Sequence, residues 1–314
     1  IGDFIGNYTS GSYAYGGAIY NNGTIDKISG NFISNRTGSY GGAVMNGTFG
    51  EGTTKGKISN ITGDFIGNHS DTHSGAIYNH GTIDDINGYF VGNSAELDGG
   101  ALDSPGTIGT ITGDFVANSA GRNGGAMVNG GYTGKISNIS GDFVSNSANE
   151  SGGAIYNNGT IEHINGDFIG NHAQGNRYIA GGAIYNVGTI GTVTGDLLHN
   201  SVKIVSGTET AVGGAVRTFK NMTFSSGSDV HFISENYTLD PTRGKIFNAV
   251  STKNSPTVTF DTTGGGAWVV NDNIENGNYV FKGNDTIDAS TGTTTQYVAM
   301  NNDIVNAANV KVEG

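Results

Sequence analysis

The chain has 314 residues, among them 55 Gly, 37 Asn, 14 Tyr and 14 Phe but only 3 Pro. Gly and Asn both tolerate left-handed backbone, so a chain this rich in them makes many tight turns and nearly excludes long helices. A formal net charge of −12 excludes the basic footprint of a nucleic-acid-binding protein, and the absence of Cys excludes disulfides, thiolate metal ligands and a Cys nucleophile.

The start of the chain and its hydropathy bear on where the protein resides. Residues 1–4 read Ile-Gly-Asp-Phe, which is neither a start Met nor a signal peptide. No apolar run approaches the ~18 residues that a membrane-spanning helix needs. We therefore expect a processed product or an excised fragment that makes no membrane contact and whose native chain continues at both ends.

A repeat of three short elements organises the chain. The first is Phe-x-x-Asn, at residues 4–7, 32–35, 65–68, 90–93, 115–118, 143–146 and 168–171, with a degenerate copy at 197–200. The second is Gly-Gly-Ala plus an aliphatic residue, at 16–19, 41–44, 74–77 (with Ser first), 99–102, 124–127, 152–155, 181–184 and 213–216. The third is Ile-x-x-Ile, at 25–28, 58–61, 83–86, 108–111, 136–139, 161–164 and 190–193 (with Val last).

Each period holds three strand-like pieces separated by Gly or Asn, which predicts one rung of a parallel β-helix. One rung cannot bury its apolar face alone, but stacked rungs share a continuous core. Residues 1–216 carry the regular repeats, and residues 217–314 contain short strand-like segments that predict degenerate rungs of the same solenoid. At about 25 residues a rung, we expect an all-β chain of about twelve rungs with three short strands each.

Comparing equivalent positions predicts which side chains face inward. The aliphatic residue after Gly-Gly-Ala is expected in the core, and the variable residue after it is expected to face solvent. The next position is usually Asn, which alternation returns inward at a corner, where stacked amides can form a ladder. The first Ile of each Ile-x-x-Ile element, such as Ile108, is expected in one buried column. Phe and the aliphatic residue after it both look buried, so we expect a bend near Asp3 and its equivalents.

Aromatic residues supply the candidate binding sites. The variable, outward position after Gly-Gly-Ala-aliphatic holds Tyr20, Tyr78, Tyr156 and Tyr185, which could stack on sugars or on another rod. Insertions at one corner add four more candidates, namely Tyr13, Tyr15, Arg177 and Tyr178. The alternative is that aromatic residues simply cover a pleated surface well, and that the insertions are neutral turns.

Carboxylate and imidazole side chains also recur, but in patterns that suggest structural roles. An Asp column, which includes Asp114 and Asp142, precedes the Phe strands and is better suited to accepting backbone N–H groups than to catalysis. His69, Asp71 and His73 lie close in sequence and His80 follows, but no ligand spacing recurs. We therefore expect no catalytic residues, no metal and no cofactor.

The alternation of Phe-x-x-Asn with Gly-Gly-Ala-Ile resembles the repeat pair of the chlamydial polymorphic membrane proteins and of related autotransporter passenger domains. The resemblance covers residues 1–216 closely and 217–314 loosely. It implies a right-handed β-helix that is secreted by the type V route and displayed outside a Gram-negative cell, commonly as an adhesin.

These observations together predict a non-enzymatic adhesin or structural stalk on the cell surface. It would act through surface contact and self-association, as in biofilms, with host-cell or surface glycans or proteins, or copies of itself, as partners and without nucleic acid. The alternatives are a carbohydrate-active β-helix enzyme, either a polysaccharide lyase or a glycosidase, and a subunit of an extracellular filament.

Overall fold

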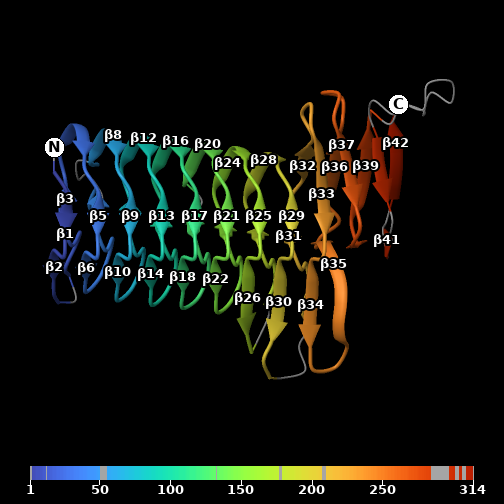
Figure 1. The fold of residues 1–314 in the computed structure, drawn as a ribbon, viewed down its shortest axis with the longest axis horizontal. Helices are drawn as coiled ribbons and strands as arrows, with labels where there is room; N and C mark the ends of the chain where they lie inside the picture. Colours follow the sequence, from blue (N-terminus) through green and yellow to red (C-terminus); the bar gives the residue numbers. More distant parts are fainter. Residues whose placement is uncertain are drawn as a thin grey trace.

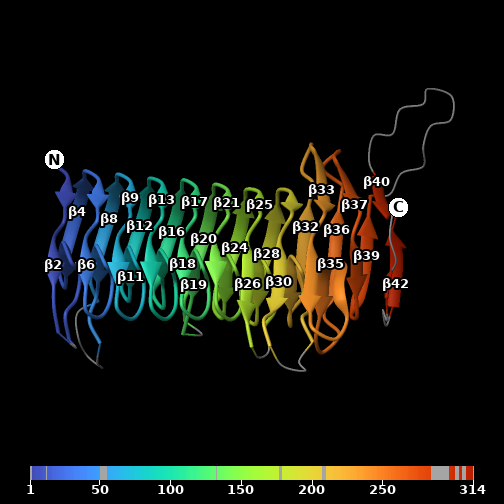
Figure 2. The same ribbon diagram turned by 60° about the horizontal axis from the view of Figure 1, so that its bottom comes forward.

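The computed structural model describes residues 2–11, 13–49, 55–131, 133–176, 179–206, 210–283, 297–300, 304–305 and 309–313. They form a right-handed parallel β-helix, in which three sheets stack their strands in the order of the sequence (Figures 1 and 2). This confirms the predicted fold class, and two of the sheets contain 11 strands each, so the described residues make eleven rungs. Among these residues, no helix is long and apolar enough to cross a membrane.

The first sheet, called here the Phe sheet, holds the Phe-x-x-Asn strands. Its members are β1 (Phe4–Ile5), β5 (Phe32–Ile33), β9 (Phe65–Ile66), β13 (Phe90–Val91), β17 (Phe115–Val116), β21 (Phe143–Val144), β25 (Phe168–Ile169), β29 (Leu197–Leu198), β33 (Val230–Ser234), β37 (Ala267–Val270) and β40 (Tyr297–Met300).

The second sheet, the Ile sheet, holds the Ile-x-x-Ile strands. Its members are β4 (Thr24–Ser29), β8 (Lys57–Thr62), β12 (Thr82–Asn87), β16 (Thr107–Thr112), β20 (Lys135–Ser140), β24 (Thr160–Asn165), β28 (Thr189–Thr194), β32 (Met222–Ser225), β36 (Thr257–Asp261), β39 (Asn278–Lys282) and β42 (Asn309–Glu313).

The third sheet, the corner sheet, takes two short strands from most rungs. The first set is β2 (Tyr8–Thr9), β6 (Arg36–Thr37), β10 (His69–Ser70), β14 (Ser94–Ala95), β18 (Ser119–Ala120), β22 (Ser147–Ala148), β26 (His172–Gly175), β30 (Ser201–Ile204) and β34 (Tyr237–Asp240). The second set is β3 (Ile19–Asn21), β7 (Val44–Asn46), β11 (Ile77–Asn79), β15 (Leu102–Asp103), β19 (Met127–Asn129), β23 (Ile155–Asn157), β27 (Ile184–Asn186), β31 (Val216–Thr218), β35 (Gly244–Thr252), β38 (Asn273–Glu275) and β41 (Ile304–Val305).

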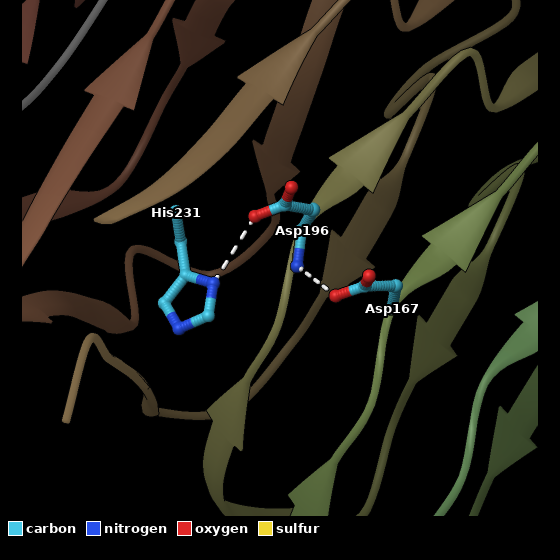
Figure 3. A group of neighbouring side chains, drawn as sticks. All are labelled: Asp167, Asp196 and His231. Carbon is cyan, nitrogen blue, oxygen red and sulfur yellow. Dashed lines mark hydrogen bonds and ion pairs between the residues drawn. The ribbon is translucent and has the colours of Figure 1, made fainter. Parts of the chain in front are cut away.

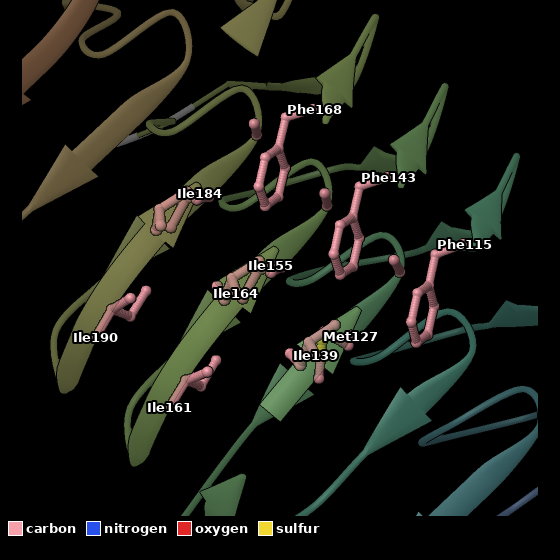
Figure 4. Close-up of a cluster of buried hydrophobic side chains, with 14 of the residues drawn as sticks. Phe115, Met127, Ile139, Phe143, Ile155, Ile161, Ile164, Phe168, Ile184 and Ile190 are labelled. Carbon is pink, nitrogen blue, oxygen red and sulfur yellow. The ribbon is translucent and has the colours of Figure 1, made fainter. Parts of the chain in front are cut away.

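The core is built from columns of like side chains that pair in register between rungs. Phe rings from Phe4 to Phe168 stack face to face, and the pair Phe90 and Phe115 has centroids 4.5 Å apart and planes within 1°. The predicted Ile column is confirmed from Ile58 to Ile190, while Ile25 in the first rung is only partly buried. Figure 4 shows two members of this column, Ile161 and Ile190, below the stacked Phe rings. Phe, Ile and Ala from all three sheets therefore fill one continuous lumen.

The expectation that the residue after each Phe is also buried is wrong. Ile5 is 62% exposed and Ile66 is 38% exposed. These strands alternate normally, so Phe points inward and its neighbour points outward. The next residue then takes a left-handed backbone, as at Gly6 (φ 64°) and Ser34 (φ 53°), and this turn directs the following Asn back into the interior.

Two ladders of buried side-chain amides run along the rod axis. In the first, the Phe-x-x-Asn residue Asn118 donates from Nδ2 to Phe90 O (2.9 Å) and Asn146 Oδ1 (3.0 Å). The second is the predicted corner ladder, in which Asn129 Nδ2 donates to Asn157 Oδ1 at 2.8 Å. Because the amide partners are fully buried, these bonds replace the water that the turns would otherwise need.

The corner sheet extends away from the rod in the seventh to ninth rungs (Figure 1). There β26, β30 and β34 are four residues long, and β34 turns back to pair antiparallel with the first half of β35. A small second core of Ala173, Ile179, Val202, Ile204 and Ala211 holds this extension together.

Candidate binding surfaces

The outward position after Gly-Gly-Ala-aliphatic is more buried than the sequence predicted. Tyr20 is 45% exposed, but Tyr78 is only 8% exposed, and Met45, Asp103 and Val128 are also buried. These side chains do point away from the lumen, but residues that precede a Gly-Gly-Ala element cover some of them, as Tyr40 does Tyr78 and His73 does Asp103. The Tyr column is therefore not one continuous exposed flank, and it divides into two separate aromatic groups.

The first group, called here the aromatic cluster, lies on the first three rungs. Ring contacts join Tyr15 to Tyr20 (5.5 Å) and to Tyr40 (6.0 Å), and Tyr40 to Phe49 (4.9 Å) and to Tyr78 (4.8 Å). Tyr20 and Phe49 remain well exposed, and nearby in the sequence Tyr13 is 85% exposed. Three of the predicted residues thus meet in one patch of stacked rings.

Burial further favours the neutral phenol form in this cluster. It raises the pKa of Tyr78 and, to a smaller degree, that of Tyr15, with nearby Tyr and Asp groups adding to the effect. Both phenols therefore stay neutral at physiological pH. A surface of neutral hydroxyls on aromatic faces can combine apolar stacking with hydrogen bonds, as Tyr-rich contact surfaces do.

Next to the aromatic cluster lies a chain of charged groups. His73 stacks on Tyr40 (5.4 Å, 4°), and its Nδ1 lies 3.4 Å from Asp103 Oδ2 and 3.6 Å from Asp98 Oδ2. Arg122 continues the chain, since its Nη1 lies 3.6 Å from Asp98. Burial lowers the pKa of His73, but the nearby carboxylates of Asp103 and Asp98 outweigh it, so the pKa is raised overall.

The second aromatic group lies on the sixth to eighth rungs and includes basic side chains. Tyr156 and Tyr185 stack at 5.1 Å, and Tyr185 contacts Phe219 at 5.5 Å. Arg217 Cζ and Lys253 Nζ lie 5.5 Å and 5.8 Å from the centre of the Phe219 ring. The predicted binding residues Arg177 and Tyr178 lie outside the described residues.

The Asp column has the structural role that the sequence suggested. Each carboxylate accepts a backbone N–H from the next rung, for example Asp142 Oδ1 from Asp167 N (2.8 Å) and Asp167 Oδ1 from Asp196 N (2.7 Å). At the end of this column, Asp196 Oδ1 accepts from Phe232 N (2.9 Å) and lies 3.1 Å from His231 Nδ1 (Figure 3). Such bonds hold successive turns in register.

Asp167, Asp196 and His231 are the one group of three metal-capable side chains in the described part of the chain, with ligand atoms within 4.8 Å of one another. One oxygen of each carboxylate already accepts a hydrogen bond from a backbone N–H group. Burial also raises the pKa of Asp167. The His-rich segment does not form such a group. His69 pairs with Asp71 at 3.2 Å, whereas His73 faces Asp103 and Asp98.

A large hollow lies along the projecting extension of the corner sheet. It has a volume of about 700 Å³ and is lined by Asn149, Glu150, Gln174, Gly175, Asn176, Ile179, Lys203 and Val205. It is open to solvent and combines amides with one carboxylate and one ammonium group. Its floor is the small second core beneath the extended strands.

Sequence reasoning missed Tyr40, Phe49, Arg217 and Phe219. Tyr40 directly precedes a Gly-Gly-Ala element, as Tyr15 does, and this shared position was the available signal. Arg217 occupies the same register position as Tyr185, which the strand pairing shows. Phe49 and Phe219 lie in loops after the corner Asn or Thr, where no repeat marks them. No family model, no curated protein and no solved structure matches this chain.

Proposed function

We propose that this chain is an extracellular, non-enzymatic β-helical rod, an adhesin or structural stalk of the autotransporter passenger type. It is displayed on the surface of a Gram-negative cell and acts by contact with other surfaces and with copies of itself. The resemblance of the repeats supports the secretion route and the location. The regular stacking of rungs supports the role of a rigid spacer, because each rung is tied to the next by backbone and side-chain ladders.

The observation that carries the contact function is the aromatic cluster. Tyr20 and Phe49 are 45% and 38% exposed while their ring neighbours Tyr40 and Tyr78 are largely covered, so the cluster presents a firm base with exposed rings on it. Large exposed aromatic residues on a rigid support are typical of contact surfaces, because little side-chain freedom remains to be lost on binding.

Sedimentation velocity and aggregation of coated beads test this function together. The parent chain should self-associate and should cause coated beads to aggregate, more strongly as the salt concentration rises and screens the charge of −12. The variant Tyr20→Ser/Phe49→Ser should lose both properties while its circular dichroism stays unchanged.

The matched control is Tyr89→Ser, which removes a 52% exposed Tyr from beside the Phe sheet. It should associate like the parent chain. If the parent is monomeric at every salt concentration and its beads stay dispersed, the contact function through this cluster is wrong. Equal effects of the two variants would show that the cluster has no special part in association.

A further inference from the structure

A second surface, called here the cationic groove, lies where the seventh to ninth rungs meet the corner of the rod. It is built by Tyr185, Arg217, Phe219, Lys220 and Lys253. Three adjoining hollows share Phe219, and their volumes are about 440, 440 and 110 Å³. Strand register explains the convergence, because β31 pairs with β35 and so brings the loops that follow them side by side.

In the described part of the chain, the basic side chains of the groove have no ion-pair partner, whereas several others in the rod do. Lys57 and Lys135 pair with Asp84 (3.0 Å) and Glu162 (2.7 Å) on neighbouring rungs. Within the described ranges, no carboxylate lies within ion-pair distance of Arg217, Lys220 or Lys253. A chain of net charge −12 therefore places three basic groups together without a direct ion pair, and the charge of Glu275, two rungs along, acts on Arg217 alone among them.

The groove is also organised in advance. Arg217 Nη1 donates to Ser251 Oγ and to Thr252 O (2.8 Å), which fixes the guanidinium beside the Phe219 ring. Lys253 lies over the same ring, and Lys220 is exposed next to it. Fixing a long side chain before binding reduces the entropy that the ligand must overcome.

The remaining lining shows which kind of anion fits. Hydroxyl and amide groups surround the hollows, supplied by Asn158, Thr160, Thr189, Asn254 and Ser255. A planar aromatic ring, amides, hydroxyls and cations together match a sugar ring that carries carboxylate or sulfate groups.

We propose that the cationic groove binds a linear acidic polysaccharide, with Lys220, Lys253 and Arg217 facing its anionic groups and Phe219 stacking on a sugar ring. This inference deepens the proposed function, since it names a class of ligand for a surface contact protein. It concerns a surface separate from the aromatic cluster, so the two proposals can fail independently.

Calorimetry on the full chain tests the proposal with defined probes. These are an oligogalacturonate, which carries only carboxylates, a heparin-derived oligosaccharide, which also carries sulfates, and a neutral dextran oligosaccharide of equal length. At least one acidic probe should bind ten times more tightly than dextran, and its affinity should fall as salt rises. The stronger of the two acidic probes identifies the anionic group. If neither binds better than dextran, the proposal is overturned.

Substitutions distinguish specific binding in the groove from general electrostatic attraction to the chain. Lys253→Glu should weaken binding of the acidic probe at least tenfold, whereas Lys27→Glu, an equal charge change at an exposed site on β4, should weaken it less than twofold. Phe219→Leu should weaken binding about fivefold and Phe219→Tyr should preserve it. Equal effects of the two Lys variants, no effect of Phe219→Leu, or equally tight binding of a single-stranded oligonucleotide would each overturn the proposal. Unchanged circular dichroism confirms that each variant folds, and unchanged sedimentation shows that the aromatic cluster is unaffected.

Discussion

Rungs before and after residue 197 fill the same lumen with different side chains. Up to Phe168 the Phe sheet supplies the stacked rings, and the Ile sheet faces them with aliphatic side chains. From Leu197 on, the Phe column continues in register as aliphatic residues, through Ile233 and Val270. The second Ile column becomes aromatic instead, with Phe224, Phe260 and Phe281 stacked at 5.3 and 5.5 Å.

This exchange shows that the two facing columns keep an apolar lumen without keeping residue identity. Within these columns the aromatic residues move from the Phe sheet to the Ile sheet, while Trp268 on β37 of the Phe sheet adds a further buried ring, and the lumen side chains stay buried in both regions. It also explains why the repeat fades in the sequence while the sheets continue without interruption. The difference extends to the surface, where the cationic groove falls in the later region.

The largest effect is expected from a charge in the shared lumen. Ile108→Asp in the regular region should lower the free energy of unfolding by about 4 kcal/mol, because it buries an unpaired carboxylate. Val258→Asp, at the equivalent column in the later region, should cost as much. Chemical denaturation measures both. Thr107→Asp, on the exposed face of β16 in register with Lys135, is the control and should change little. A mild effect of Val258→Asp would contradict the idea of one continuous lumen.

The buried amide ladder should give the next largest effect. Asn118→Ala removes two donated bonds and leaves the Asn93 N–H and Nδ2 without their acceptor, so it should cost about 3 kcal/mol. Within the described residues of the later region, the last position of the ladder is Asp272, which accepts from Asn236 N and Nδ2.

Asp272→Asn keeps an oxygen acceptor at this position and removes the carboxylate. Burial raises the pKa of that carboxylate. A raised carboxyl pKa makes the folded state less stable as pH rises, so this variant should be as stable as the parent or slightly more stable at pH 7. Thermal melting at pH 7 compares it with Asn118→Ala. A loss in Asp272→Asn as large as in Asn118→Ala would show that the charge itself holds the ladder end.

A swap across the lumen tests whether the two facing columns compensate each other in volume. Leu197→Phe should overpack the eighth rung and Phe224→Leu should leave a cavity there, at about 1–3 kcal/mol each. The double variant should be at least ~1 kcal/mol more stable than the sum predicts. Leu197→Phe combined with the distant Phe65→Leu is the control and should be additive. Additive behaviour of both pairs, measured by denaturation, would mean that the columns fill the lumen independently.

The smallest effect is expected from a change in pH, and it arises from His73 in the regular region. The pKa of His73 is raised above its ordinary value of 6.5, so the ion pair with Asp103 contributes fully below that value. This contribution, on the order of 1 kcal/mol, should be lost as pH rises through the raised pKa. Melting curves between pH 6 and pH 9 measure it. The variant His73→Gln should lack this part of the pH dependence, and an unchanged profile would exclude His73 as its source.

Periodicity alone was enough to predict the solenoid, the buried Ile column and the corner amide ladder. A side chain that recurs once per rung is held in one environment by the parallel register, so comparing equivalent positions reveals which face is buried. The same reasoning predicted that the Asp column accepts hydrogen bonds from backbone N–H groups. Candidate sites were predicted less well. Tyr20 and Tyr15 do meet in a surface cluster, but Tyr78 is covered.

The sequence by itself determined the features that each rung repeats, because stacking gives equivalent residues the same environment in every rung along the axis. Only the tertiary structure decided what lies over the outward positions, since the covering residues come from connections that vary in length and composition. It also decided that Arg217, Phe219 and Lys253 converge, because they are separated in the sequence and meet only through the pairing of β31 with β35. The exchange of aromatic residues between the two columns has the same origin, since side chains that face each other across the lumen must pack together.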